Sequence, residues 1–348
     1  MNEGVAVNDG RSERSDRYSR QERFTPIGLA GQARLASARV AIIGCGALGT
    51  AIAEQLCRAG VGFLRLIDRD FVEWSNLQRQ SLFSEGDACR SAPKAMAAAE
   101  RLRAINSTCV IEPLVEDLRA ANAERLLAGV DLVLDGCDNF PTRHLVNEVC
   151  CKLAMPWIYG ACVGSYGLSA PIIPGQTPCL RCLQDELPGA GETPTCDTAG
   201  IIPPAVQMVA AWQVAEALKL LIGDHAALRR ELWACDLWRG TFQRLRLSGW
   251  RQSSCAVCGE APTYPLLSAG DDAAVVLCGR DAVQVRRAGV DLATLAGQVG
   301  PALLLANDYL VRWRDGGVTA TCFRDGRVIV QGVADASAAR AFCDRWLG

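Results

Sequence analysis

Three glycines form a G-x-G-x-x-G pattern between a predicted strand and a predicted helix. Gly44, Gly46 and Gly49 follow the apolar run ARVAIIG and precede the helical segment TAIAEQLCRAG. This spacing lets phosphate approach the backbone closely, and the start of the helix supplies N–H donors and a positive dipole. Asp68, at the end of the next predicted strand, is suited to accept hydrogen bonds from ribose hydroxyls. The pattern predicts a nucleotide site. Alone it would suggest NAD, or glycines that serve only strand–helix packing.

The segment that follows is richer in cations, amides and carboxylates than a dehydrogenase needs. Its polar residues are Asp68, Asp70, Asn76, Arg79, Gln80 and Lys94. Arg and Lys neutralise charge as the bond from the α-phosphate to pyrophosphate breaks, and a carboxylate can bind Mg²⁺. Asp138, in the DGCDN segment at the C-terminal end of another predicted strand, points to the same edge of the sheet. Any one of these residues could be a solvated loop residue, but together they predict a nucleotidyl-transfer site.

Two C-x-x-C pairs, Cys179/Cys182 and Cys255/Cys258, lie in segments rich in Pro, Gly and polar residues. Four thiolates suit a closed, tetrahedral, structural zinc site. A redox disulfide and an iron–sulfur cluster are the alternatives, but a redox pair usually opens a helix within its own βαβ unit and neither pair does. We therefore predict Zn²⁺ that ties a long loop to the end of the main domain.

Cys196 lies in a predicted loop, PTCDTAGIIPP, where a thiolate could act as a nucleophile or could simply be a loop cysteine. Six other cysteines fall in predicted strands or helices and are expected to behave as small buried hydrophobes: Cys57, Cys137, Cys150, Cys151, Cys162 and Cys278. Seventeen cysteines without an export signal predict a cytoplasmic protein with reduced thiols.

Alternating strand and helix patterns must position these residues. They predict an α/β fold, a doubly wound, mostly parallel Rossmann-like sheet covered on both faces. The predicted strands are 38–44, 63–70, 110–117, 131–139 and 155–164. Residues 167–200, rich in Pro, Gly and Cys, predict a long irregular functional loop, and residues 203–223 predict a core helix.

Length and composition fit one large domain and one small one in a chain of 348 residues. We expect a disordered lead-in at 1–16, a nucleotide-binding domain at 17–262 and a small α+β domain at 265–348, whose role stays open. The net charge of −2 argues against a general nucleic-acid binder. No apolar run reaches the roughly 18 residues of a membrane span, so we expect neither nucleic acid nor a membrane as partner.

The segments RYSRQ, GCGALG, DRDFVEWSNLQRQ, APKA, DGCDN, CLRC, TCDTAG and CAVC stand in an order that resembles the ThiF/MoeB/HesA family and the related adenylation domain of ubiquitin-activating enzymes. The resemblance runs from about Arg17 to Gly259. It implies ATP-dependent adenylylation of the C-terminal glycine carboxylate of a sulfur-carrier or ubiquitin-like protein ending in Gly-Gly. Sulfur transfer or thioester formation would follow, in a homodimer.

The same resemblance assigns roles to individual residues. Phosphates would lie on the turn, Asp68 would hold the ribose, and Asp138 would coordinate Mg²⁺. Arg20 would reach the partner's site in the dimer, and Cys196 would attack the adenylate. The wider nucleotide set is Gly44, Gly46, Ala47, Leu48, Gly49, Asp68, Asp70, Asn76, Arg79, Gln80, Lys94, Asp138 and Asn139. Ala47 replaces a frequent glycine, and Ser91-Ala92 replaces the usual Gly-Gln pair.

Two alternatives remain open. An NAD-dependent oxidoreductase would need a well-placed catalytic histidine, tyrosine or lysine, but the only histidines are His144, on a predicted helix, and His225, in a loop. A non-catalytic scaffold subunit of a heteromeric activating enzyme usually lacks the Arg, Lys and Asp residues that this chain keeps. The pathway, whether thiamine, molybdopterin, cysteine, thiopeptide or protein conjugation, is not fixed by these residues.

Overall fold

The computed structural model describes residues 13–185, 196–269, 275–277, 282–287 and 289–347. The chain divides into two compact units. Unit 1 comprises Met1–Leu187 and Ile201–Ala269, and unit 2 comprises Pro188–Gly200 and Gly270–Gly348.

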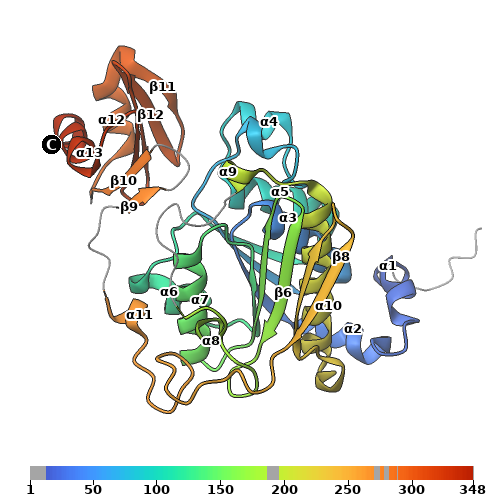
Figure 1. The fold of residues 1–348 in the computed structure, drawn as a ribbon. Coiled ribbons are helices and arrows are strands. Elements are labelled where there is room, and N and C mark those ends of the chain that lie inside the picture. Colours follow the sequence, from blue (N-terminus) through green and yellow to red (C-terminus); the bar gives the residue numbers. More distant parts are fainter. Residues whose placement is uncertain (1–12, 186–195, 270–274, 278–281, 288, 348) are drawn as a thin grey trace, which may run out of the picture. The chain divides into compact units, whose positions relative to one another are not determined.

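Unit 1 is built on an eight-stranded sheet in the order β3-β2-β1-β4-β5-β6-β7-β8 (Figure 1). The strands are β1 Arg39–Ile43, β2 Phe63–Ile67, β3 Val110–Leu114, β4 Leu132–Asp135, β5 Trp157–Val163, β6 Tyr166–Ile172, β7 Glu231–Asp236 and β8 Thr241–Arg246. In this spatial order the neighbouring strands from β3 through β2, β1 and β4 to β5 pair parallel. From β5 through β6 and β7 to β8 they pair antiparallel. The predicted doubly wound, mostly parallel sheet is confirmed.

The prediction of an irregular loop over 167–200 is wrong in its first part, because β6 lies there between β5 and β7. Gly167 and Pro171 conceal the strand in the sequence, since both residues are rare within strands. Pro171 pairs with Ile158 of β5 and lies beyond Ser169, where the ladder with β7 ends. Its missing N–H therefore costs no bond to β7.

Helices cover both faces of the parallel half. On one face α3 (Ala47–Ala59), α5 (Lys94–Ile105) and α10 (Pro203–Ile222) share a buried cluster with β1 and β2. On the other face α6 (Ala120–Leu127) and α7 (Phe140–Lys152) pack against the sheet. Helix α10 has the length and hydropathy of a membrane-spanning helix, but its buried residues pack in this core as those of a soluble core helix do.

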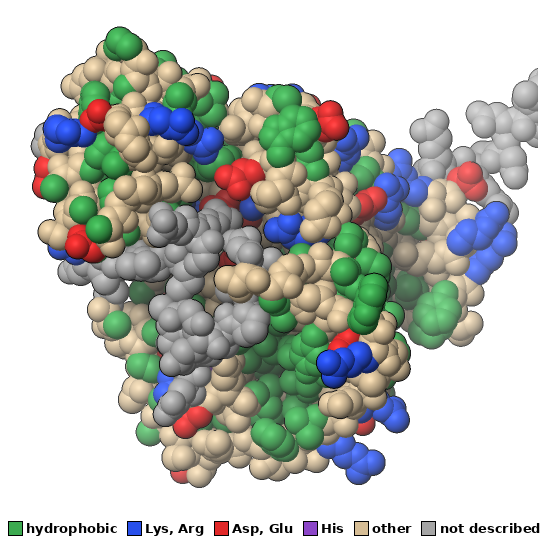
Figure 2. Space-filling view, turned by 45° about the horizontal axis from the view of Figure 1, so that its top comes forward, with side chains coloured by type: hydrophobic (Ala, Val, Ile, Leu, Met, Phe, Trp, Pro, Cys, Tyr) green, Lys and Arg blue, Asp and Glu red, His purple; other side chains and the backbone are tan. Residues whose placement is uncertain are grey.

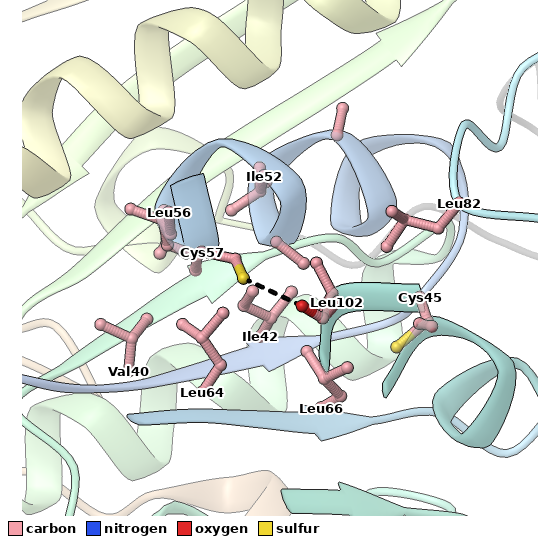
Figure 3. Close-up of a cluster of buried hydrophobic side chains, with 14 of the residues drawn as sticks. Val40, Ile42, Cys45, Ile52, Leu56, Cys57, Leu64, Leu66, Leu82 and Leu102 are labelled. Carbon is pink, nitrogen blue, oxygen red and sulfur yellow. Dashed lines mark hydrogen bonds between the residues drawn. The ribbon is translucent and has the colours of Figure 1, made fainter. Parts of the chain in front are cut away.

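The packing of α3 explains the apolar, β-branched character of β1 (Figure 3). Ile42 of β1 and Leu64 and Leu66 of β2 are fully buried beneath Ile52 of α3. Cys57 lies in the same cluster, with its Sγ 3.5 Å from the carbonyl oxygen of Leu102. This thiol is a buried core group, as predicted.

Shorter elements complete unit 1. They are α1 Glu13–Glu22, α2 Gly28–Ser37, η1 Trp74–Asn76, α4 Glu85–Cys89, α8 Leu180–Leu183, η2 His225–Ala227 and α11 Pro265–Ser268. Helix α1 includes the last residues of the predicted disordered lead-in, and residues 1–12 lie outside the described part of the chain.

Unit 2 contains a six-stranded antiparallel sheet in the order β11-β12-β13-β14-β10-β9. Its elements are α9 Cys196–Ala199, β9 Val275–Leu277, β10 Ala282–Arg286, α12 Leu292–Val299, η3 Gly300–Ala302, β11 Leu303–Ala306, β12 Leu310–Asp315, β13 Val318–Phe323, β14 Arg327–Gln331 and α13 Ala336–Leu347. A separate buried cluster joins the strands to α12 and α13 around Trp313, which stacks on Phe342 at 6.2 Å between ring centroids. The predicted small α+β fold is confirmed.

Candidate active site and cysteine cluster

The glycine turn lies at the carboxyl edge of the parallel strands, in backbone contact with the end of β4. The N–H of Gly44 donates to the carbonyl oxygen of Ile67 at 2.8 Å, and its φ of +88° is one that L side chains rarely adopt. A Cβ on Gly49 would lie 1.8 Å from the carbonyl oxygen of Gly44, and one on Gly136 would lie 2.6 Å from the same atom. No side chain fits at these contacts, so β1, α3 and β4 meet through glycine.

Gly46 differs from its neighbours because it faces open space. Among the described residues, the only atom within 4 Å of a Cβ built there is Nε2 of Gln80, at 3.9 Å. Gly46 is the N-cap of α3, so the free N–H groups of that helix start at this point. The Oε1 atom of Gln80 is buried and has no hydrogen-bond partner in the described part of the chain. The donors that this turn can offer an anion are the free N–H groups at the start of α3.

Asp68 joins the turn to the end of β2. Its side chain is 8% exposed. One carboxylate oxygen accepts from the N–H of Cys45 at 2.6 Å, and the other accepts from the N–H of Asp70 at 2.6 Å. Burial raises the pKa of Asp68, and the nearby ammonium of Lys94 opposes that rise. Each oxygen keeps a lone pair that a ribose hydroxyl could use.

Lys94 is the first residue of α5 and is only 5% exposed, so its ammonium group is buried at this edge of the sheet. Its Nζ lies 3.7 Å from a carboxylate oxygen of Asp70. Arg69 pairs with Asp117 at 2.9 Å and lies 3.9 Å from Asp70. Burial lowers the pKa of Arg69, but the carboxylates of Asp117, Asp70 and Asp138 outweigh burial and keep that pKa above its usual value. Neither Arg69 nor Asp117 was predicted from the sequence, although both lie in the last two residues of predicted strands.

Asp138 is exposed just beyond β4. One of its carboxylate oxygens accepts from Nδ2 of Asn139 at 3.0 Å. Asn139 caps α7, since its Oδ1 accepts from the N–H of Thr142 at 2.9 Å. The carboxylate of Asp138 is thus presented at the edge, where a hard cation would find an oxygen ligand.

Asn76 and Arg79 lie on the segment after β2, and the side-chain hydrogen bonds that the structure gives them stay within that segment. Buried Asn76 accepts from the N–H of Glu73 at 3.0 Å, and half-buried Arg79 donates to the carbonyl oxygen of Ser75 at 2.7 Å.

The structure does not bring Arg20 to these residues. Its helix, α1, packs with Tyr18 against Gly60, at the end of α3 opposite the turn. The guanidinium of Arg20 is exposed, and it donates to Oγ of Ser19 at 3.1 Å. Cys196 begins α9, but its side chain lies outside what the structure describes.

The four predicted cysteine ligands come together. The Sγ atoms of Cys179, Cys182, Cys255 and Cys258 all lie within 4.8 Å of one another. The Cys182–Cys258 pair is 3.4 Å apart and the Cys179–Cys255 pair 3.7 Å apart. Burial raises the pKa of Cys182 to about 11, so this cluster needs a cation to hold it as thiolates. Four sulfur donors at these separations fit Zn²⁺.

Helix α7 and a loop arginine support the cluster. The Oδ1 atom of Asn147 accepts from the N–H of Leu180 at 2.8 Å, beside the first pair. The guanidinium of Arg251 donates to the carbonyl oxygen of Cys258 at 3.0 Å, beside the second.

Comparison with known proteins agrees with this architecture. Residues 18–257 match the ThiF family. The chain is 47% identical over 338 residues to the sulfur carrier protein ThiS adenylyltransferase of Bacillus subtilis, covering 95% of this chain and 99% of that protein. It is 38% identical to the sulfur carrier protein adenylyltransferase of Thermus thermophilus, over 72% of this chain and 93% of that one.

A solved structure titled E. coli MccB with ATP has the same fold. Its TM-score is 0.59 at 23% identity, with 70% of this chain and 74% of that chain covered. At this identity the likeness bears on the fold alone. The family match covers most of unit 1, including the glycine turn, Asp138 and three of the four clustered cysteines, and ends one residue before Cys258. The expected resemblance is confirmed. The chain belongs to the ThiF family.

Proposed function

We propose that this protein is an ATP-dependent adenylyltransferase that activates the C-terminal glycine carboxylate of a small sulfur-carrier protein. The observation that carries the proposal is the assembly of the glycine turn, Asp68, Lys94 and Asp138 at one edge of the sheet. The B. subtilis relative, which matches over 95% of this chain, is a sulfur carrier protein adenylyltransferase. An NAD enzyme would not need this set of charges.

The residues divide the work by chemistry. The turn and the start of α3 hold phosphate oxygens, and Asp68 accepts from the ribose. Lys94, Arg79, Asn76 and Gln80 face the triphosphate and neutralise or orient its oxygens. Lys94 would exchange its contact with Asp70 for a phosphate oxygen. Asp138 would hold Mg²⁺, which neutralises charge on the phosphates when it is bound.

The reaction is an in-line substitution at the α-phosphorus. A carboxylate oxygen of the carrier forms the new bond, while the bond from the α-phosphorus to the bridging oxygen breaks. Pyrophosphate leaves with that electron pair. No protein base is required because the C-terminal carboxyl group is already ionised at neutral pH. Positioning and charge neutralisation supply the rate.

The activated carbonyl would next be attacked by sulfur. If the nucleophile is the thiolate of Cys196, a thioester forms and AMP leaves. If it is hydrosulfide from a separate donor, its sulfur forms the new bond to the carbonyl carbon, AMP leaves, and the carrier becomes a thiocarboxylate. Cys196→Ser separates these routes, because it leaves adenylylation intact and blocks only the first.

Zinc at the cysteine cluster would be structural. All four protein ligands are thiolates, which leaves no open coordination position for substrate. The need for reduced thiols fits the predicted cytoplasmic location.

A carrier protein would dock on exposed apolar surface. Large hydrophobic side chains are exposed on the antiparallel part of the sheet: Tyr166 of β6, Trp238 in the β7–β8 turn, and Phe242 and Leu245 of β8. Hydrophobic side chains gather on the face of the molecule shown in Figure 2. Patches of this kind are typical of protein partners.

Pyrophosphate–ATP exchange tests the proposal. The protein is incubated with ATP, Mg²⁺, labelled pyrophosphate and candidate carriers ending in Gly-Gly. We expect label to enter ATP only when the cognate carrier is present, and exchange to be lost in Asp138→Ala. If ATP binds but no carrier supports exchange, the chain is a scaffold rather than an adenylyltransferase.

A homodimer in which Arg20 serves the partner's site is part of the proposal. Arg20→Ala and Asp138→Ala should each be inactive alone. After mixing and subunit exchange, a mixed dimer contains one intact site, so about a quarter of wild-type activity should return. No recovery on mixing would contradict the role of Arg20 across an interface.

A further inference from the structure

A buried ion pair lies directly behind the proposed magnesium residue. Asp135, the last residue of β4, is 1% exposed, and Arg143 of α7 is 6% exposed. The Nε atom of Arg143 lies 3.0 Å from Oδ2 of Asp135. Neither residue was singled out in the sequence, and neither belongs to the proposed nucleotide set.

The pair holds both polar backbone groups of Cys137, the residue immediately before Asp138. The N–H of Cys137 donates to Oδ1 of Asp135 at 2.9 Å. Nη2 of Arg143 donates to the carbonyl oxygen of Cys137 at 2.6 Å. A residue whose N–H and C=O are both held has its two flanking peptide groups restrained, so the start of the loop is fixed.

Further contacts restrain the pair itself. The guanidinium of Arg143 lies 5.5 Å from the ring of Phe140 and 5.7 Å from that of Tyr159. It also donates to the carbonyl oxygen of Gly160 at 3.3 Å, while the N–H of Gly160 donates to Asp135 at 3.3 Å. Arg143 is thus packed between two rings and tied to β5.

Gln213 of α10 holds the same strand end from the other face of the sheet. Its side chain is fully buried, and its Nε2 donates to the carbonyl oxygens of Asp135 and Ile158 at 2.9 and 3.1 Å. The amide packs so closely on β5 that a Cβ at Gly160 would lie 2.4 Å from it. Side chains from α7 and α10 therefore clamp the end of β4 between them.

Stability alone is a weak reason for such a pair, because a buried ion pair is often no better for stability than apolar residues of the same volume. What the pair adds is geometry, since guanidinium and carboxylate fix hydrogen bonds in direction as well as distance. Burial lowers the pKa of Arg143 but the carboxylate of Asp135 outweighs it, and the arginine stays charged.

We infer that Arg143 is a positioning residue, which together with Asp135 fixes the backbone of Cys137 so that the carboxylate of Asp138 is held ready for Mg²⁺–ATP. This inference rests on the proposed role of Asp138. It predicts that loss of Arg143 weakens the apparent affinity for Mg²⁺ far more than the binding of nucleotide without metal.

The test uses the full-length protein and five variants, of which Asp138→Asn checks the metal assignment. Arg143→Met removes the clamp, and Arg143→Lys keeps the charge without the fork of donors. Asp135→Asn combined with Arg143→Met avoids an unpaired buried carboxylate, in case the single variant does not fold. Arg229→Met is the matched control, because Arg229 is another buried arginine of unit 1, 4.0 Å from Glu216 and remote from Cys137 in its contacts.

Two readouts are needed. In pyrophosphate–ATP exchange, we expect Arg143→Met and the double variant to raise the Mg²⁺ concentration for half-maximal rate by about 10-fold to 100-fold, as loss of a metal ligand's outer partner typically does. Arg143→Lys should recover part of this loss. ATP affinity measured without Mg²⁺ should change by less than about 2-fold, since the turn is intact.

The second readout is amide hydrogen exchange of residues 136–142 in the protein without ligands. It should accelerate at least about 10-fold in Arg143→Met and the double variant, as local opening becomes easier, and stay at the wild-type rate in Arg229→Met. Unchanged exchange in this segment, or an equal Mg²⁺ shift in Arg229→Met, would overturn the inference. If the segment is loosened but Asp138→Asn leaves Mg²⁺ dependence unaltered, the clamp stands and the metal assignment of Asp138 fails.

Discussion

The carboxyl edge of the parallel strands and the cysteine cluster are both assembled from distant segments, and both contact α7, but different forces hold them. The edge is closed by glycine backbone contacts and by buried ion pairs, all supplied by the chain. The cluster brings together four cysteine side chains, and as neutral thiols these have no charge that would hold them to one another. The nucleotide site is therefore preorganised, whereas the cysteine cluster depends on its metal.

The largest effect should follow loss of a zinc ligand. Cys258→Ala should lower the free energy of unfolding of unit 1 by more than about 4 kcal/mol, the range reached when a structural metal is lost. Cys235→Ala, at a buried thiol of β7 outside the cluster, is the control and should cost far less. Denaturant unfolding and zinc content by atomic absorption measure both. Equal losses in the two variants would show that the cluster does not hold a structural metal.

The glycine turn should show a smaller but sharper contrast. Gly49→Ala places a methyl group against the carbonyl oxygen of Gly44, so the free energy of unfolding should fall by about 3 kcal/mol without any ligand. Gly46→Ala meets open space and should change stability by less than about 1 kcal/mol. It should nevertheless weaken ATP binding about tenfold or more, or about 1.4 kcal/mol, because the methyl group occupies the phosphate's approach.

Urea unfolding and calorimetric ATP titration separate these two outcomes. If Gly46→Ala binds ATP as the wild type does, phosphate does not lie on the turn. If both variants lose the same stability, the direct backbone contact between β1 and α3 is not what closes the edge.

The buried carboxylate of Asp68 should give the nucleotide site a pH dependence. Burial raises its pKa, and only the ionised form accepts fully from ribose. ATP affinity should therefore be present above the raised pKa and fall as the pH drops through it, by up to about tenfold or 1.4 kcal/mol. In Asp68→Asn this component should vanish. Protonation of ATP itself is common to both proteins, so parallel curves would contradict the role of Asp68.

The smallest effect concerns His144 on α7, between the two sites. Burial lowers its pKa to about 4, and the unfolded chain keeps an ordinary value near 6.5. Between these values the unfolded state binds more protons, so stability is complete above pH 6.5 and is lost as the pH falls toward 4. The melting temperature should fall with pH by a few degrees more than in His144→Gln. A constant difference between the two proteins across this range would contradict the assignment.

Local patterns explain why much of the site could be predicted from the chain. The glycine turn begins directly after a strand, and Asp68 and Asp138 each lie within three residues after the end of one, so the strand pattern alone places them at one edge. The cysteine cluster was predictable because two C-x-x-C pairs together supply a complete set of ligands. The roles of these residues stay predictions.

The missed features depend on contacts between elements. Arg143 and Gln213 stand on helices at positions that look like ordinary core or surface residues, and only the packing of α7 and α10 across the sheet brings them to Asp135. The pairing of Arg69 with Asp117 likewise depends on β2 and β3 being neighbours. Strand β6 was missed because its Gly and Pro contradict strand propensity, which burial between β5 and β7 overrides.

The most direct test of the account is the mass of the carrier protein itself. The wild-type protein, ATP, Mg²⁺ and a cognate carrier ending in Gly-Gly are mixed without a sulfur donor, quenched in acid and examined by intact-mass spectrometry. We predict that the carrier gains one adenylyl group at its C-terminus with release of pyrophosphate, in the wild type and in Cys196→Ser but not in Lys94→Ala or Asp138→Ala. An unmodified carrier in the wild-type reaction, or equal adenylylation in Asp138→Ala, would contradict the claim that this edge performs the chemistry.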